Sequence, residues 1–155
     1  MQTSRGFTII ELIVVILVLG ILVTITALGL VRYQLDARDT QRSTNVSIIA
    51  EALEKYYNEK GEYPSCSVLT GSVGTLTGNS GIFPGMSTSV FRAPGAANGV
   101  TNSIQCTDLI SVTSADYYAY VGDSGSCTGT TTCLKYVLKY KEEATNTIQS
   151  LSSRR

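Results

Sequence analysis

The chain has 155 residues, with 12 basic and 12 acidic side chains and no histidine. The balanced charge argues against a strongly basic nucleic-acid-binding domain, so we predict no specific nucleic-acid partner. The lack of histidine excludes Ser-His-Asp and Cys-His catalytic arrangements. We therefore expect a protein that is not an enzyme and needs no cofactor.

The first predicted element is an apolar helix over Phe7–Val31, in which Glu11 is the one formal charge. At about 1.5 Å per residue, this helix is long enough to cross the hydrocarbon core of a bilayer. A carboxylate inside such a span costs several kcal/mol unless a cation neutralises it. Glu11 therefore predicts a positively charged partner from outside this helix.

The start of the chain resembles the type IV pilins, a family that includes the pseudopilins of type II secretion and the competence pilins. The resemblance rests on the leader 1–6, the Gly6–Phe7 junction, Glu11 four residues after Phe7, and the unbroken apolar helix. It implies that a membrane-embedded prepilin peptidase cuts after Gly6 and methylates the new amino terminus at Phe7. It also implies that Glu11 pairs with the terminal ammonium of a neighbouring subunit.

Two other interpretations of this segment fit less well. A secretory signal peptide has an apolar region of about 7–15 residues, which is shorter than the run from Phe7 to Val31. An ordinary signal anchor explains the length, but it explains neither the short leader nor Glu11.

Two glycines, Gly20 and Gly29, interrupt the apolar helix. Each weakens a helix by about 1 kcal/mol relative to alanine. One interpretation is a segment that loosens when subunits leave the bilayer for a filament. The other is close packing of small residues between membrane helices. The sequence leaves both open.

The helix is expected to continue through 32–61 as an amphipathic half, because apolar side chains recur there at spacings of three and four. Gly61 is expected to end it. This half should pack on a sheet through its apolar stripe. The stripe consists of Val46, Ile49, Ala50, Leu53, Tyr56 and Tyr57.

The remaining residues, 62–155, predict a globular head and give the chain an α+β fold. A loop rich in Gly, Ser, Thr and Asn is expected over 65–115. Strands are expected near 117–121, 133–141 and 147–151, and they should form a small antiparallel sheet on the helix. The tail Ser152–Arg155 is expected to be loose.

The four cysteines, all beyond the apolar helix, predict two disulfides in an oxidising compartment. A zinc site is disfavoured because the chain has neither histidine nor a CxxC pair. Sequence alone allows three pairings. If the strands around 117–121 and 133–141 form a hairpin, Cys127 and Cys133 lie across its connection. Cys66 would then join Cys106 and close the long loop.

Asp116, Asp123 and Glu142–Glu143 could hold a calcium ion. These residues do not show the dense alternation of carboxylates found in calcium loops. A solvated turn is the competing interpretation, and we expect no metal.

Taken with the resemblance, these features predict a structural subunit of an extracellular type IV pilus, a homo-oligomeric helical filament. Its precursor would cross the cytoplasmic membrane once. The expected partners are the prepilin peptidase, the pilus assembly platform and minor pilins. One alternative is a pseudopilin of a secretion or competence system. Another is a surface binding module that is anchored by a single helix and never polymerises.

Overall fold

The computed structural model describes residues 6–106, 112–123, 127 and 133–155. The leader residues 1–5 and part of the predicted 65–115 loop lie outside the described residues. The chain divides into two compact units, Met1–Leu35 and Asp36–Arg155. The second unit is called the head.

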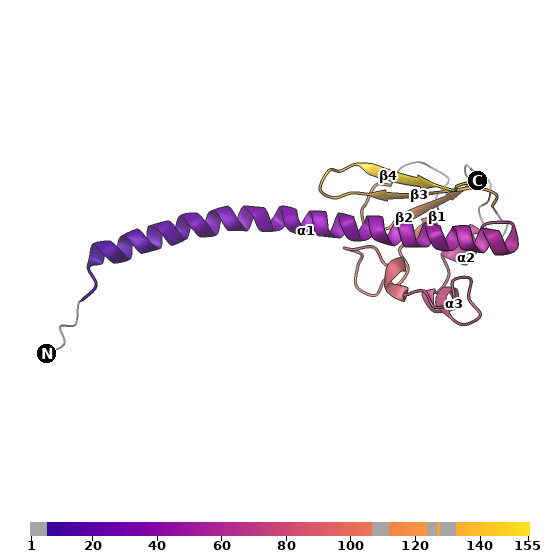
Figure 1. Ribbon diagram of the computed structural model, residues 1–155, viewed down its shortest axis with the longest axis horizontal. Coiled ribbons are helices and arrows are strands. Elements are labelled where there is room, and N and C mark those ends of the chain that lie inside the picture. Colours follow the sequence, from indigo (N-terminus) through magenta and orange to yellow (C-terminus); the bar gives the residue numbers. More distant parts are fainter. Residues whose placement is uncertain (1–5, 107–111, 124–126, 128–132) are drawn as a thin grey trace. The chain divides into compact units, whose positions relative to one another are not determined.

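A single long helix, α1 (Ile9–Lys60), runs from the apolar segment into the head sequence and confirms the predicted helix (Figure 1). It ends at Gly61, whose backbone N–H donates to the carbonyl of Tyr57 at 2.7 Å. Gly61 has a φ of 79°, in the left-handed region that glycine adopts without steric cost. The predicted helix stop therefore has the usual glycine geometry.

The head is built around the predicted stripe of α1. Val46, Ile49, Ala50 and Leu53 are buried, and Tyr56 and Tyr57 pack against the same core while partly exposed. The sheet contributes aromatic and aliphatic side chains to this core. These are Tyr118, Tyr120, Tyr136, Leu138 and Tyr140.

The sheet has four strands in the order β1-β2-β3-β4. They are β1 (Ile104–Cys106), β2 (Tyr118–Gly122), β3 (Tyr136–Lys141) and β4 (Ile148–Ser152). The three strands expected from the sequence form the antiparallel part, β2-β3-β4. β1 pairs with β2 in parallel, which corrects the expectation of a purely antiparallel sheet. β1 escaped prediction because three residues are too few to show alternation.

The stretch predicted as a long loop contains further short elements: α2 (Cys66–Leu69), α3 (Val73–Thr77), a 3-10 helix η1 (Thr88–Phe91) and β1. Apolar side chains hold these elements to the core. The buried ones are Leu69, Val73, Leu76, Val90, Phe91 and Ile104, and Phe83, between α3 and η1, is buried as well. The stretch is therefore folded onto the core at several points, as its scattered apolar residues indicate.

The C-terminal tail is tied to α1, contrary to the expectation of a loose end. The backbone N–H of Arg154 donates to Glu54 at 3.2 Å. The guanidinium of Arg155 donates to Asn58 at 3.1 Å and lies 5.4 Å from the ring centroid of Tyr57. A cation placed over an aromatic face in this way is attracted by the ring's quadrupole.

Candidate functional site

Helix α1 begins with a reciprocal cap formed by Thr8 and Glu11. The Thr8 backbone N–H and hydroxyl both donate to Oε2 of Glu11, at 3.0 and 2.8 Å. The Glu11 backbone N–H donates to the Thr8 hydroxyl oxygen at 3.3 Å. This is the capping box expected of a Thr-x-x-Glu sequence at a helix start. The spacing signals the cap in the sequence, although no role was predicted for Thr8.

The cap leaves one oxygen of the Glu11 carboxylate, Oε1, available. Both hydrogen bonds from Thr8 reach Oε2, and none of the described residues donates to Oε1. The negative charge lies in the first turn of α1, where the helix dipole favours an anion. Next to it, Phe7 is highly exposed. The start of α1 thus presents an oriented carboxylate that can form an ion pair with a cation from outside the chain.

The apolar half of α1 has its side chains exposed throughout the residues whose side chains are described, from Phe7 to Val31. By length and composition, α1 contains a segment able to cross a membrane, with a mean hydropathy of 3.0 over its most apolar window. Such a surface needs lipid or other protein to cover it.

The helix continues through Gly20 and Gly29 without a break. A Cβ placed on either glycine would meet nothing within 4 Å. Thr24 donates its hydroxyl proton to the carbonyls of Gly20 and Ile21, and Thr26 bonds to the preceding turn in the same way. The chain's own packing therefore does not require either glycine.

Comparison with known proteins gives the following findings. A family model described as "Prokaryotic N-terminal methylation motif" matches residues 1–27. The chain is 32% identical over 110 residues to "Fimbrial protein EcpC" of Eikenella corrodens, covering 64% of this chain and 70% of that protein. The chain belongs to the type IV pilin family. It is also 32% identical over 60 residues to "Type IV major pilin protein PilA" of Myxococcus xanthus (strain DK1622). That match covers 39% of this chain and only 27% of the relative. No solved structure matches this pilin.

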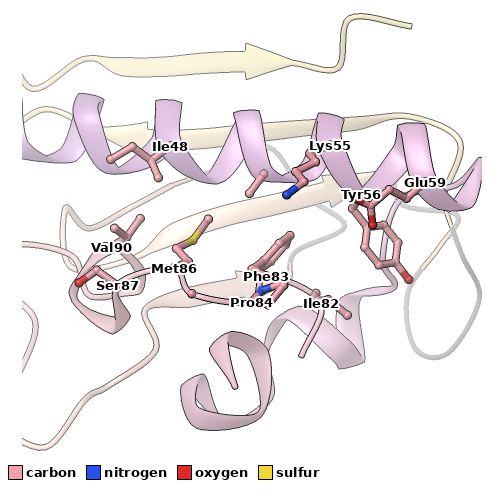
Figure 2. Close-up of a pocket in the computed structure, with 12 residues that line it drawn as sticks. Ile48, Lys55, Tyr56, Glu59, Ile82, Phe83, Pro84, Met86, Ser87 and Val90 are labelled. Carbon is pink, nitrogen blue, oxygen red and sulfur yellow. The ribbon is translucent and has the colours of Figure 1, made fainter. Parts of the chain in front are cut away.

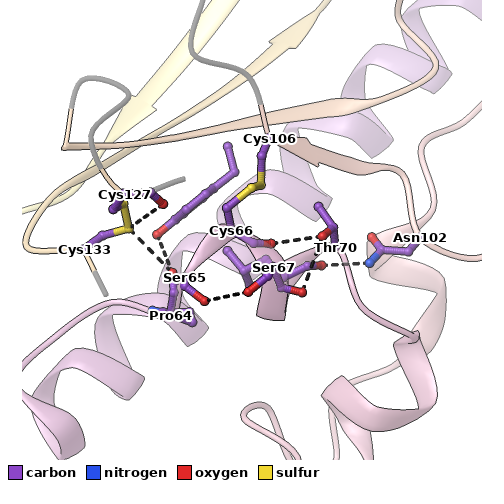
Figure 3. The surroundings of a disulfide bond; sticks show 11 residues. Pro64, Ser65, Cys66, Ser67, Thr70, Asn102, Cys106, Cys127 and Cys133 are labelled. Atoms are coloured by element: carbon purple, nitrogen blue, oxygen red, sulfur yellow. Dashed lines mark hydrogen bonds between the residues drawn. A yellow bond between two sulfur atoms is a disulfide. The ribbon is translucent and has the colours of Figure 1, made fainter. Parts of the chain in front are cut away.

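Both disulfides predicted for the pilin head are confirmed. Cys66–Cys106 joins α2 to β1 with a Cα–Cα distance of 5.8 Å, and Cys127–Cys133 has a Cα–Cα distance of 5.6 Å (Figure 3). Gly122 lies against the second bridge, and a Cβ there would collide with both sulfur atoms. The last residue of β2 is thus small because the disulfide occupies the space beside it.

A buried arginine, which the sequence did not reveal, ties the head end of α1 to three distant segments. Arg42 is fully buried. Its guanidinium donates to Asp39 at 2.7 Å, to the Ala115 carbonyl at 2.9 Å, to the Pro94 carbonyl at 2.6 Å and to Glu143. A buried charge is tolerated only when it is paired and hydrogen-bonded in this way. The role of Arg42 is structural, since its side chain is closed off from solvent.

Asp39 completes this cluster by accepting the backbone N–H groups of Glu143 and Ala144, each at 2.9 Å. Burial acts to raise the pKa of Asp39. The two backbone hydrogen bonds and the Arg42 guanidinium outweigh burial, so the pKa lies below its ordinary value. Asp39 therefore stays ionised and holds the turn before β4.

Tyrosines fill the space between α1 and the sheet. Tyr63 and Tyr136 are buried with ring centroids 4.7 Å apart, and both hydroxyls donate to Glu54, at 3.0 and 3.3 Å. Burial, with the Glu54 carboxylate as a second cause, raises the pKa of Tyr63 to about 12. The tyrosines are therefore core residues, as their number suggested.

The acidic residues considered for calcium are each engaged by donors within the head. Asp116 accepts the Ser114 hydroxyl, and Asp123 accepts the backbone N–H groups of Leu134 and Lys135. Glu142 accepts the hydroxyls of Thr145 and Thr147, and Glu143 pairs with Arg38 and Arg42. Within the described part of the chain, one group of three metal-ligating side chains occurs: Asp123 with Cys127 and Cys133. Its two sulfurs form a disulfide and are not available as thiolates.

The head also carries an apolar groove of about 480 Å³ between α1 and the segment 82–90 (Figure 2). Apolar side chains dominate its lining, among them Ile48, Tyr56, Phe83 and Met86. The charged residues of the lining are Lys55 and Glu59, from α1. Such a lining offers packing surface and no nucleophile paired with a base.

Proposed function

We propose that this pilin is the structural subunit of an extracellular type IV pilus, made as a precursor with one membrane-spanning helix. The observation that carries the proposal is the capped carboxylate of Glu11 at the start of an exposed apolar helix. In hydrocarbon, the hydrogen bonds from Thr8 offset only part of the cost of this charge. A cation at the free oxygen of Glu11 neutralises the remainder.

Processing after Gly6 supplies that cation. Cleavage converts the backbone nitrogen of Phe7 into a terminal ammonium, which methylation leaves positively charged. A Cβ on Gly6 would meet nothing within 4 Å, so the chain's own fold does not demand glycine there. This favours a demand from outside the chain, namely the close fit of a peptidase around the cut. The ammonium of one subunit then pairs with Glu11 of its neighbour.

Packing of the apolar helices forms the shaft. In water, each large apolar side chain left exposed would cost about 1.5–3 kcal/mol, so subunits that leave the bilayer must cover one another. Gly20 and Gly29 are the points at which we propose that the helix loosens during this transfer. A single head-to-tail contact that does not close on itself generates an open helical filament.

The precursor therefore lies in the cytoplasmic membrane before assembly, and the filament lies outside the cell. The partners that follow are a second copy of this chain, the prepilin peptidase, the assembly platform and minor pilins. The disulfide-bonded head suits exposure on an extracellular fibre, because its bridges form in an oxidising compartment.

Intact-mass analysis of protein from sheared surface filaments tests this function. The expected species begins at Phe7 and carries one methyl group. Gly6→Val should leave the uncut precursor in the membrane. Filaments made of chains that keep residues 1–6 would contradict the processing step. Processed protein without any surface fibre would favour a pseudopilin, and uncut protein displayed at the surface would favour an anchored binding module.

A further inference from the structure

Strand β4 forms an open edge of the head sheet. Among the strands of the described residues it pairs with β3 alone, in the order β1-β2-β3-β4 (Figure 1). The backbone N–H of Glu142 donates to the carbonyl of Thr147, and the backbone N–H of Ser153 donates to the carbonyl of Tyr136. In an antiparallel ladder, residues whose backbone groups bond to the neighbouring strand alternate with residues whose backbone groups point away from it. Hence Ile148, Ser150 and Ser152 direct their backbone N–H and C=O groups to the free side.

This edge lacks the features that usually protect a sheet edge. Edge strands commonly carry charges, prolines or bulges, or are kept very short. β4 has five residues, Ile-Gln-Ser-Leu-Ser, all exposed and with no charge or proline. Ile148 and Leu151 retain 47% and 39% of their surface. The opposite edge, β1, has three residues and is joined to α2 by the Cys66–Cys106 disulfide.

We propose that β4 is a self-association edge, on which β4 of a second copy of this chain docks antiparallel. With Ser150 at the two-fold axis, Ser150 lies opposite Ser150 of the second copy. Ile148 then lies opposite Ser152, and the outward backbone groups of all three residues are paired. The side chains that lie opposite each other across this strand pair are Ile and Ser, so the pairing opposes no like charges.

Charge at the strand ends favours a second copy in this orientation. Arg154 follows β4 and is exposed, whereas the turn before β4 carries Glu142. Antiparallel docking places the basic end of each copy beside the acidic turn of the other. A parallel arrangement would place like charges together at both ends, which is unfavourable.

The contact is isologous, because the same surface is used by both copies, and it therefore gives a closed dimer. It cannot extend the shaft, which needs a contact that repeats without closing. In a filament, β4 docking would therefore join heads of neighbouring fibres side by side. This last consequence depends on the proposed function, whereas the contact itself does not.

Single cysteine substitutions in the full-length chain, solubilised in detergent, test the contact. Ser150→Cys should form a covalent dimer on mild oxidation, because paired Cα atoms at such a site lie about 5.5 Å apart, within disulfide range. Ser152→Cys is the matched control. It presents the same thiol on the same face, but its nearest partner is Ile148 of the second copy, so it should stay monomeric alone. Mixing Ile148→Cys with Ser152→Cys should restore cross-linking.

Peptide mapping should show the two introduced thiols joined and both native disulfides intact. Equal cross-linking by Ser150→Cys and Ser152→Cys, no cross-linking by either, or capture of a different protein would overturn the proposal.

Sheared fibres give a second readout: wild-type fibres should bundle, Ser150→Lys fibres should lose their bundles, and Ser150→Thr fibres should keep them. Cross-linking without any fibres would leave β4 docking in place and count against the filament. Normal fibres without cross-linking or bundles would count against β4 docking alone.

Discussion

The guanidinium of Arg42 donates to the carboxylate of Glu143, 101 residues further along the chain, inside the head. This contact joins α1 to the turn that leads into β4, and the Pro94 and Ala115 carbonyls accept from the same guanidinium. The head is therefore organised around a charge as well as around the apolar stripe of α1.

Arg42→Met should destabilise the head by about 3 kcal/mol, because it leaves the carboxylate of Asp39 without its cation and that of Glu143 with only the more exposed Arg38. Arg38→Met is the control. Arg38 also pairs with Glu143, at 3.2 Å, but its side chain is 42% exposed, so its loss should cost less than about 1 kcal/mol. Denaturant unfolding of the two variants measures the difference. Equal costs would show that burial of Arg42 does not set its contribution.

Alkaline pH should weaken the head through Tyr63. The pKa of Tyr63 is raised to about 12 in the fold, against about 10 for a tyrosine in the unfolded chain. Between these values the folded chain binds more protons than the unfolded chain. Stability is therefore fully present below about pH 10 and falls as pH rises towards about 12. Tyr63→Phe should reduce this fall, and Tyr33→Phe, at an exposed position, should not. Thermal unfolding at several alkaline pH values, with tyrosinate absorbance as the titration signal, checks this.

Gly122→Ala should block or strain the Cys127–Cys133 bridge, because the added Cβ would overlap both sulfur atoms. Overpacking of this kind costs about 1–3 kcal/mol. Gly74→Ala is a matched control, since its nearest neighbour would be the Ser72 hydroxyl at an ordinary 3.8 Å. Thiol counting and peptide mapping should find free Cys127 and Cys133 or a less stable head in the first variant only. A native bridge at unchanged stability in Gly122→Ala would mean that the backbone accommodates the methyl group.

The sequence predicted the parts of the fold that depend on local pattern. The spacing of Val46, Ile49 and Leu53 indicated the buried face of α1, and the hairpin argument gave the Cys127–Cys133 pairing. β1 depends on a parallel partner 14 residues away, Tyr118 for Ile104, which no local pattern reveals.

The same limit applies to the site. Glu11 was evident because a lone charge in an apolar run is costly. Arg42 was not, because an arginine in a charged stretch of helix is ordinarily solvent-exposed. Asp39 is a neighbour on the same helix, but only the fold brings Glu143 and two carbonyls around Arg42.

Thr8→Val should lower filament yield while leaving membrane insertion unchanged. Valine has nearly the same shape as threonine, but it removes the hydroxyl that donates to Glu11 and accepts from its backbone N–H. The carboxylate then keeps only the bond from the backbone N–H of position 8, so its orientation is less well fixed. Loss of such a cap costs about 1 kcal/mol. Thr8→Ser retains the hydroxyl and should assemble normally. Quantifying sheared filaments against total membrane protein checks this, and equal yields from both variants would remove Thr8 from the assembly site.

The most direct test of the account is the filament yield of Glu11→Gln. Glutamine keeps the size of the side chain and its hydrogen bonds with Thr8, but it cannot neutralise an ammonium. We predict that the variant inserts into the membrane and is cut after Gly6, and that surface filaments are largely lost. Filaments at the wild-type level from processed Glu11→Gln protein would contradict pairing between Glu11 and the Phe7 ammonium.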